Sequence, residues 1–335
     1  MEPILIIPII VGFFITLFFT PFWIKKARKI GLVWEDMNKT FTLKNIAGSG
    51  GLVVLLGFII GVLSYIAIKT FILNTNSTTI EIFSLLTTVL IAGMIGFIDD
   101  IFGWVHGGMS AKLRIFLLIF AAVPLMVINA GESNMIGIEF GLFYPLVLIP
   151  LGVVGASTTF NFLAGYNGLE SSQGIILLST LSFVSWKVGS SWLALILLIM
   201  VACLFAFYIF NKCPASIFPG DVLTYSVGSL IAIAAILGNI EKIAVFFFIP
   251  YIIEVGLKLR GNLKKESFGK VNEDGSLDMP YEKVYGLEHL AIKLLKKIKK
   301  DGKVYEKDVV LAINLFQIAI ILIGFALFRN SIFLV

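Results

Sequence analysis

The chain has 335 residues, of which 58% are apolar and only 14% are charged. A soluble domain has about 45–50% apolar and about 25% charged residues, so the composition excludes a soluble protein. It also excludes a disordered or nucleic-acid-binding chain, and the net charge of +5 is modest. The two cysteines and two histidines lack the spacing of a disulfide framework or a zinc site. The composition therefore predicts an integral membrane protein.

Ten apolar runs predict membrane-spanning helices, each of which needs about 20 residues. The runs lie at 3–24, 50–72, 82–98, 113–130, 142–160, 173–186, 192–210, 222–238, 243–257 and 309–328. The first run lacks the basic n-region and the small-residue cleavage site of a signal peptide, so we expect a retained helix. The predicted fold is an all-α polytopic membrane protein of about ten transmembrane helices, with residues 1–335 forming a single integral membrane domain.

The basic residues are distributed very unevenly between the two sides that these spans define. The loops after spans 1, 3, 5, 7 and 9 hold 22 of the 26 lysines and arginines, and the other side holds only Lys69, Lys187, Lys242 and Arg329. Cytoplasmic loops carry the excess of positive charge in membrane proteins. We therefore expect the basic loops in the cytoplasm and both termini outside.

The last of these cytoplasmic loops, 258–308, is the only long polar segment. A Glu273-Asp274-Gly275 turn between short extended stretches predicts a small β-hairpin. Residues 287–300 then place apolar side chains at helical spacing with lysines opposite, which predicts an amphipathic helix. Such a helix suits an anionic membrane surface, with packing on the rest of the protein as the alternative.

Adjacent acids follow the third span, at Asp99 and Asp100. The C-terminal end of a helix disfavours anions, and neighbouring carboxylates repel each other unless a cation is present. The pair is therefore a candidate metal site or general base. The alternative is a pair of solvated acids at a helix end.

Further polar groups follow the fifth span and precede the eighth. Asn161, Asn167 and Glu170, with Gly168 between the last two, suit a folded loop with several oxygen ligands, although Asn-Gly alone is a turn signal. Asp221 follows Phe218 and two turn-forming residues, where an N-cap is the simpler interpretation.

Basic residues that could hold phosphates stand near these acids in the expected topology. They are Lys258, Arg260, Lys264 and Lys265 after the ninth span and Lys112 after the third, with ordinary cytoplasmic charge as the alternative reading. Acids, amides and cations on one face of a bundle are what Mg²⁺-assisted handling of a pyrophosphate requires, because Mg²⁺ takes oxygen ligands and substrate phosphates.

The combination of motifs resembles the polyprenyl-phosphate N-acetylhexosamine-1-phosphate transferases, and the resemblance covers essentially the whole chain. It rests on Asp99-Asp100, on the stretch from Asn161 to Glu170, and on Phe218-Pro219-Gly220-Asp221. The stretch 161–170 is similar to the eukaryotic and archaeal UDP-N-acetylglucosamine–dolichyl-phosphate N-acetylglucosaminephosphotransferases. Two further stretches, Met37-Asn38-Lys39-Thr40 and 275–281, are similar to the eukaryotic enzyme. Bacterial branches typically carry Asp-Gly where this chain has Asn167-Gly168.

The resemblance implies a reaction in which a lipid phosphate attacks UDP-GlcNAc and releases UMP, as the first membrane step of lipid-linked oligosaccharide assembly for N-glycosylation. It implies Mg²⁺, with Mn²⁺ as the alternative cation, held by Asn161 and Asp221. Asp99 and Asp100 would position or deprotonate the lipid phosphate, or help to hold the metal. The substrate-binding residues implied are Asn167, Gly168 and Glu170 in the loop, Phe218 against the uracil, and Lys112, Arg260, Lys264 and Lys265.

One departure from the family concerns the residues after the ninth helix. Relatives carry an Arg-His-Arg or His-rich cluster where this chain has Lys264-Lys265-Glu266, so the contacts to the sugar or pyrophosphate can differ. Another UDP-N-acetylhexosamine is an alternative donor, and an ion-coupled secondary transporter or a membrane scaffold is an alternative function. Membrane lipids are expected partners, a homodimer is one option for the assembly, and the composition favours an archaeal plasma membrane with the active site on the cytoplasmic face.

Overall fold

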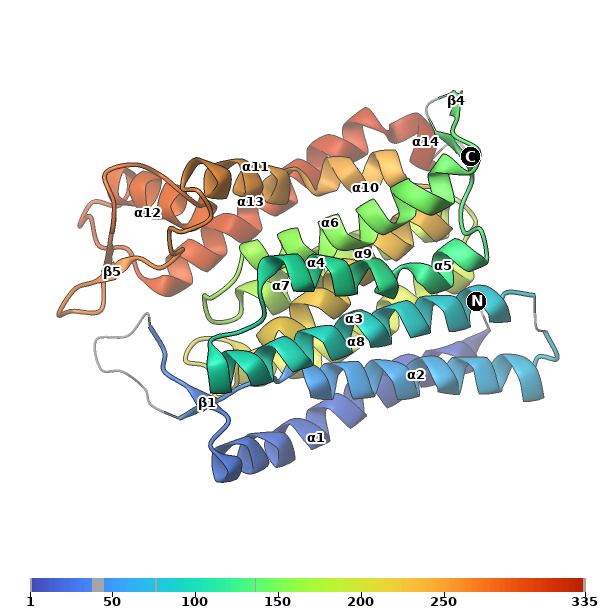
Figure 1. Cartoon of the computed structure of the whole chain (residues 1–335), viewed down its shortest axis with the longest axis horizontal. Coiled ribbons are helices and arrows are strands. Elements are labelled where there is room, and N and C mark those ends of the chain that lie inside the picture. The colour runs from blue at the N-terminus through green and yellow to red at the C-terminus, as the bar shows by residue number, and fades with distance from the viewer. Residues whose placement is uncertain (1, 38–44, 76, 136, 334–335) are drawn as a thin grey trace.

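A computed structural model describes residues 2–37, 45–75, 77–135 and 137–333 of the chain. Its long helices run roughly along one common direction and form a single bundle (Figure 1). The longer helices are α1 (Ile7–Ile30), α2 (Gly51–Phe71), α3 (Thr79–His106), α4 (Ala111–Ala121), α6 (Ile149–Phe162), α7 (Leu169–Lys187), α8 (Ser191–Asn211), α9 (Gly220–Leu237), α11 (Ile249–Arg260), α12 (Leu287–Ile298) and α13 (Glu306–Leu327). Shorter helical pieces are η1 (Pro3–Ile6), α5 (Val123–Val127), η2 (Tyr144–Leu148), α10 (Glu241–Phe247) and α14 (Arg329–Phe333).

Within the described residues, seven helical stretches are long and apolar enough to cross a membrane. They are Pro3–Ile30, Gly51–Phe71, Thr79–Val105, Tyr144–Phe162, Ser191–Asn211, Gly220–Leu237 and Glu306–Leu327. The prediction of a largely helical, membrane-spanning chain agrees with this architecture. The count of ten spans is reduced to seven that meet both requirements.

The other three predicted spans form helices that are shorter or more polar. The run at 113–130 is divided into α4 and α5, and the run at 243–257 is divided into α10 and α11. In both cases the second helix has a proline in its first turn, which starts a helix but cannot continue one. The run at 173–186 lies within α7, whose first turns bury polar side chains such as Gln173.

Helix α9 lies at the centre of the bundle and packs against α3, α6, α2 and α7. Almost every residue of α9 from Val222 to Ile236 is buried. The contact with α3 is close because α3 carries Gly96, where a side chain would overlap the backbone of Asp221. The missing side chain at Gly96 therefore brings the acidic turn of α3 directly beside the start of α9.

The short sheets and the loops that carry them gather mainly at one end of the bundle. Strands β1 (Val33–Trp34) and β2 (Ile46–Ala47) form one antiparallel pair, and β5 (Lys270–Val271) pairs with β6 (Leu277–Asp278) where the sequence predicts a hairpin. Helix α1 begins and α13 ends at the opposite end of the bundle (Figure 1). At that end lies the pair β3 (Asn134–Met135) and β4 (Ile138–Glu139).

Helix α12 follows the hairpin and covers the predicted amphipathic segment. Its residues Leu287, Ala291 and Ile292 are buried against the protein, whereas Leu294 and Ile298 are exposed. Leu290 and Leu295 are partly buried against the same core, so packing on the protein accounts for five of the seven apolar side chains of α12. The membrane-surface interpretation remains a prediction for the two exposed side chains, as does the placement of this end of the bundle in the cytoplasm.

Candidate active site

A cavity of about 400 Å³ lies at the end of the bundle that carries β1. It is enclosed by the connection after α1, the ends of α3, α6 and α8, the loop before α7 and the start of α9. Six residues that the sequence singles out line it: Asp100, Asn161, Asn167, Glu170, Phe218 and Asp221. The fold thus collects motifs that lie more than 100 residues apart around one space.

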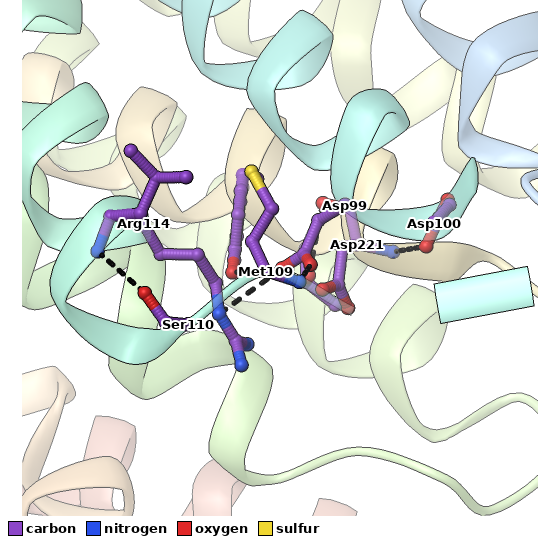
Figure 2. A network of polar contacts seen from close by, with 9 residues as sticks. Asp99, Asp100, Met109, Ser110, Arg114 and Asp221 are labelled. Atoms are coloured by element: carbon purple, nitrogen blue, oxygen red, sulfur yellow. Dashed lines mark hydrogen bonds and ion pairs between the residues drawn. The ribbon is translucent and has the colours of Figure 1, made fainter. Parts of the chain in front are cut away.

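Asp99 does not line this cavity and is held in a polar niche on the other side of the α3–α9 contact. Its side chain is 3% exposed, and its Oδ1 accepts a hydrogen bond from the backbone N–H of Met109 at 2.7 Å. Its Oδ2 lies 3.2 Å from Nε of Arg114 and accepts a longer hydrogen bond from Tyr225. Figure 2 shows Asp99 among these groups, beside Asp221. The niche therefore fixes the Asp99 carboxylate with a cation and two donors.

Asp100, the next residue of α3, points into the cavity. Its Oδ1 accepts a hydrogen bond from the backbone N–H of Asp221 at 2.7 Å, whereas its Oδ2 is buried without a partner among the described residues. Asp221 lies in the first turn of α9, whose N-cap, Pro219, offers no side-chain hydrogen bond. The carboxylate of Asp100 thus caps α9 from a neighbouring helix, where the free N–H groups and the helix dipole favour an anion.

The position of Asp221 contradicts the prediction that this residue is the N-cap of the helix. Asp221 follows Gly220, the first residue of α9, and makes no cap hydrogen bond. A side chain on Gly220 would overlap the carboxylate of Asp100, and Gly220 has a φ of 71° that favours glycine. The cap interpretation is therefore wrong, and the Asp221 carboxyl group faces Asp99 and the cavity instead.

Side chains of α3, α6 and α9 that carry oxygen atoms suited to a hard cation line the same cavity. The Asp221 carboxyl group lies close to that of Asp99, and it lines the cavity. Asn161, near the end of α6, adds an amide oxygen to the same cavity. No three acidic, histidine or cysteine side chains in the described part of the chain form a complete metal cage. Mg²⁺ does not need one, because it keeps waters and substrate phosphates as ligands.

The loop between α6 and α7 is shaped by two glycines with positive φ and by acids that bind its backbone. Gly165 has a φ of 109° and donates its N–H to Glu170 Oε1 at 2.7 Å. Gly168 has a φ of 81°, and a side chain there would press on Tyr208. Glu170 therefore holds the loop closed and also lines the cavity. Gly168 provides the positive φ that the turn requires.

Asn167 is held at both its backbone and its side chain. Its N–H donates to Oε1 of Glu306 at 2.7 Å, and Glu306 is the first residue of α13. Its Nδ2 donates to Oδ2 of Asp36 at 2.9 Å. Asn167 and Asp36 are both nearly fully buried, and both line the cavity.

Phe218 reaches the cavity from a strand-like segment before α9. Its backbone N–H donates to the carbonyl of Ala47 at 2.8 Å, and its carbonyl accepts from Gly50 at 2.9 Å. These bonds tie the segment to β2 and to the start of α2. The half-buried ring of Phe218 thereby forms part of the cavity wall.

The predicted phosphate-binding cations occupy different places. Lys265 lines a second, smaller cavity of about 260 Å³, which shares Asn161, Ala164 and Phe268 with the first. Its ammonium group also lies 4.6 Å from the ring centre of Tyr281. The exposed side chains of Lys112, Arg260 and Lys264 line neither cavity.

A buried lysine takes part in the second cavity. Lys258 lines it, lies 3.6 Å from Oε1 of Glu254 and is hydrogen-bonded to Ser267. Behind it, burial raises the pKa of Glu288 well above its usual range, and the charge of Glu254 adds to the rise. Lys258 is therefore the cation of the 258–265 group that the fold holds most firmly.

The segment that closes the cavity after α1 carries none of the site residues predicted from the sequence. Trp34, Glu35, Asp36 and Met37 all line the cavity. The one signal was the resemblance at Met37-Asn38-Lys39-Thr40, of which residues 38–40 lie outside the described residues. An acidic pair beside that stretch could have drawn attention to Asp36.

Comparisons with known proteins bear on this geometry. The profile of the family described as glycosyl transferase family 4 matches residues 82–239. A protein of Saccharolobus solfataricus named as a UDP-N-acetylglucosamine–dolichyl-phosphate N-acetylglucosaminephosphotransferase is 38% identical over 297 residues, which cover 87% of this chain and 88% of the relative. A protein of Sulfolobus acidocaldarius with the same name is 31% identical, and the alignment covers 92% of each chain. The chain belongs to the polyprenyl-phosphate N-acetylhexosamine-1-phosphate transferases.

A bacterial relative is less similar in sequence. A phospho-N-acetylmuramoyl-pentapeptide-transferase of Streptococcus pyogenes is 29% identical over 263 residues, which cover 74% of this chain and 77% of the relative. The family profile runs from α3 to the end of α9, so it includes Asp99, Asp100, the Asn161–Glu170 loop and Asp221. The residues that match the family profile therefore include the helices that carry the acidic side chains of the cavity.

Proposed function

We propose that the chain transfers N-acetylglucosamine-1-phosphate from UDP-GlcNAc to a polyprenyl phosphate of the dolichyl type and releases UMP. This is the first membrane step of lipid-linked oligosaccharide assembly for protein N-glycosylation. The observation that carries the proposal is the convergence of Asp100, Asn161, Asn167, Phe218 and Asp221 on one cavity. Relatives named for this reaction match the chain over nearly its whole length.

The chemistry is a displacement at phosphorus. An oxygen of the lipid phosphate attacks the β-phosphorus of UDP-GlcNAc, and a new P–O bond forms as the bond from that phosphorus to the bridging oxygen breaks. The bridging oxygen leaves with UMP and takes up the negative charge. A phosphate monoester is already largely ionised at pH 7, so the attacking group needs positioning more than a strong base.

The oxygen-rich corner of the cavity fits a divalent cation. Asn161 and Asp221 would hold Mg²⁺, and the partnerless Oδ2 of Asp100 would be available to a water bound to the ion, through which it can position the lipid phosphate. When bound, the ion supplies charge neutralisation for the pyrophosphate. Asp100 orients the reacting end of the acceptor, and Asp99 with Arg114 supports Asp221 from behind.

The two cavities, which share Asn161, Ala164 and Phe268 in their walls, suit the two ends of the donor. Phe218 offers an aromatic face for the uracil, and Asn167 offers an amide for its edge. Lys258 and Lys265 in the smaller cavity supply positive charge toward the phosphates or the sugar. The pyrophosphate would then lie near Asn161, which both cavities share.

An apolar groove beside α6 suits the lipid chain of the acceptor. It has a volume of about 470 Å³, is lined by residues of α6, α9, α10 and α11, and extends to Thr159, two residues before Asn161. The small residues Gly152, Gly155 and Ala156 leave the α6 side of the groove open. A prenyl chain in this groove would bring its phosphate to the acidic corner.

The direct test is release of UMP by the purified protein. Mixed with Mg²⁺, UDP-GlcNAc and a polyprenyl phosphate, the protein should release UMP and form the lipid pyrophosphate sugar in equal amounts. A panel of UDP-sugars decides between GlcNAc and another N-acetylhexosamine, the alternative donor. No UMP release with any lipid and sugar tested would remove the proposal, and an ion-coupled transporter would then be the next hypothesis.

The groove assignment has its own test. Gly155→Leu should fill the groove without a backbone clash, because nothing lies within 4 Å of a Cβ atom at Gly155. We expect KM for the lipid phosphate to rise about tenfold, with UMP binding unchanged. Gly256→Leu is the matched control, since Gly256 of α11 is equally open but lies outside the groove. Equal KM values for the two variants would contradict the assignment.

The sidedness of the reaction follows from the charge distribution. The cavity lies at the end of the bundle where the basic loops gather, so we place the active site on the cytoplasmic face. An archaeal plasma membrane is the location that the composition favours.

A further inference from the structure

The side chain of Asn167 has only one hydrogen-bond orientation open to it. Its Nδ2 donates to Oδ2 of Asp36 at 2.9 Å, and its backbone N–H is bound to Glu306. Within the described residues its Oδ1 accepts no hydrogen bond, and Asn167 lines the cavity. The amide therefore offers its acceptor oxygen to whatever occupies the cavity.

Asp36 is what makes this orientation fixed. A free asparagine amide can rotate by 180° and exchange its donor and its acceptor at little cost. An ionised carboxylate has acceptors only, so it binds the NH₂ group and repels the carbonyl oxygen. Asp36 is 2% exposed and Asn167 is 5% exposed, and a low-dielectric surrounding strengthens this preference.

A fixed amide distinguishes the two pyrimidine bases. Uracil presents an N3–H donor between two carbonyl oxygens, whereas cytosine presents an N3 acceptor beside an NH₂ donor. An amide that can rotate serves either edge, but one held with Oδ1 toward the base matches the N3–H of uracil and faces N3 of cytosine with a second acceptor. Two acceptors left opposed in a buried site weaken binding strongly.

We propose that Asp36 is a positioning residue that sets the donor nucleotide: by locking the Asn167 amide it makes the site accept uridine and reject cytidine nucleotides. This inference rests on the proposed function, because it assumes that the base lies against Asn167. It assigns to Asp36 a role in specificity rather than in the transfer step.

The test is a comparison of UMP and CMP binding to the purified full chain by isothermal titration calorimetry. Wild-type protein should bind UMP about 10- to 100-fold more tightly than CMP, the range expected when a buried hydrogen bond is replaced by an unpaired group. In Asp36→Asn the new amide can turn either end toward Asn167. The UMP/CMP affinity ratio should then fall about tenfold, with weaker UMP binding and stronger CMP binding. Glu139→Gln, an exposed acid in β4, is the control and should keep the wild-type ratio.

A double-mutant cycle separates positioning from general damage. Because Asp36 acts through Asn167, Asp36→Asn should change the ratio no further in an Asn167→Ala background. Thermal unfolding of each variant shows whether it is folded. If Asp36→Asn is too unstable to measure, Asn167→Ala alone decides, since wild-type selectivity in that variant contradicts the inference.

The remaining outcomes are distinct from one another. An unchanged ratio in folded Asp36→Asn overturns the role of Asp36, and so does equal binding of UMP and CMP by the wild type, which leaves a nucleotide site in place. Binding of neither nucleotide by the wild type overturns the inference together with the proposed function.

Discussion

Asp99 and Asp100 are neighbours in the sequence, yet they lie in different surroundings. Asp99 is enclosed by Arg114, Tyr225 and the backbone of Met109, outside the cavity. Asp100 faces the cavity and retains an oxygen with no partner among the described residues. One carboxylate is fully engaged in holding the structure, and the other is left available for a ligand.

The cause of the difference is the geometry of the helix. Consecutive residues on an α-helix point about 100° apart, so a pair of adjacent acids meets two different neighbours. Helix α3 continues to His106, so both acids lie inside its last turns rather than at its end. A repeated acid in a sequence therefore need not indicate two copies of one role.

The largest loss of activity should follow from removing the carboxyl groups that line the cavity. We expect Asp100→Asn and Asp221→Ala each to lower kcat/KM for UMP release by at least about 10³-fold, because each removes an oxygen ligand or positioning group from the reacting centre. Asp221→Ala should also abolish the dependence of UMP release on added Mg²⁺.

The controls for these variants are structural. Circular dichroism and thermal unfolding should show that both variants keep their helices. Turnover within tenfold of the wild type in a folded Asp100→Asn protein would mean that the partnerless oxygen has no part in the reaction.

A smaller loss of turnover is expected on the enclosed side. Asp99→Asn places an NH₂ group against Arg114 and should destabilise the fold by about 1–3 kcal/mol, the cost of a lost charged hydrogen bond. We expect a lower thermal midpoint and a fall in kcat of about tenfold or less. The double variant Asp99→Asn with Arg114→Gln should regain part of the stability. A loss of activity as large as for Asp100→Asn, at unchanged stability, would erase the distinction between the two acids.

The smallest effect concerns another adjacent pair, Lys264 and Lys265. Lys265 lines the second cavity and Lys264 does not. Lys265→Ala should raise KM for UDP-GlcNAc a few-fold and leave kcat almost unchanged, because one partly solvated charge is worth about 1 kcal/mol or less. Lys264→Ala should change neither constant. Steady-state kinetics with equal effects from both lysines would assign their role to general surface charge.

Much of the site could be anticipated from the sequence. Asp100, Asn161, Asn167, Phe218 and Asp221 stand next to predicted span ends, and the charge distribution puts those ends on one side. In a helical bundle, helix ends on the same side lie near one another, so this grouping of residues can be predicted without knowing how the helices pack. The helices could also be predicted, because a long apolar run in a membrane has few alternatives to an α-helix.

Other features depend on contacts between distant segments and could not be predicted. Asp36 meets Asn167 across 131 residues of sequence, and no local pattern marks either partner for the other. Asp221 reads as an N-cap because the residue that caps α9, Asp100, lies on a different helix. A rule based on apolar length counted three further spans, because it takes no account of the prolines that start α5 and α11 or of the polar side chains that α7 buries.

The bond between Asn167 and Glu306 has a consequence for biosynthesis. Glu306 opens the last long helix, 139 residues after the loop that it holds. During translation the loop of residues 163–168 therefore lacks this bond until nearly the whole chain has been synthesised. We expect a partly inserted chain to hold this loop less firmly, so the candidate donor site is completed only with the last long helix.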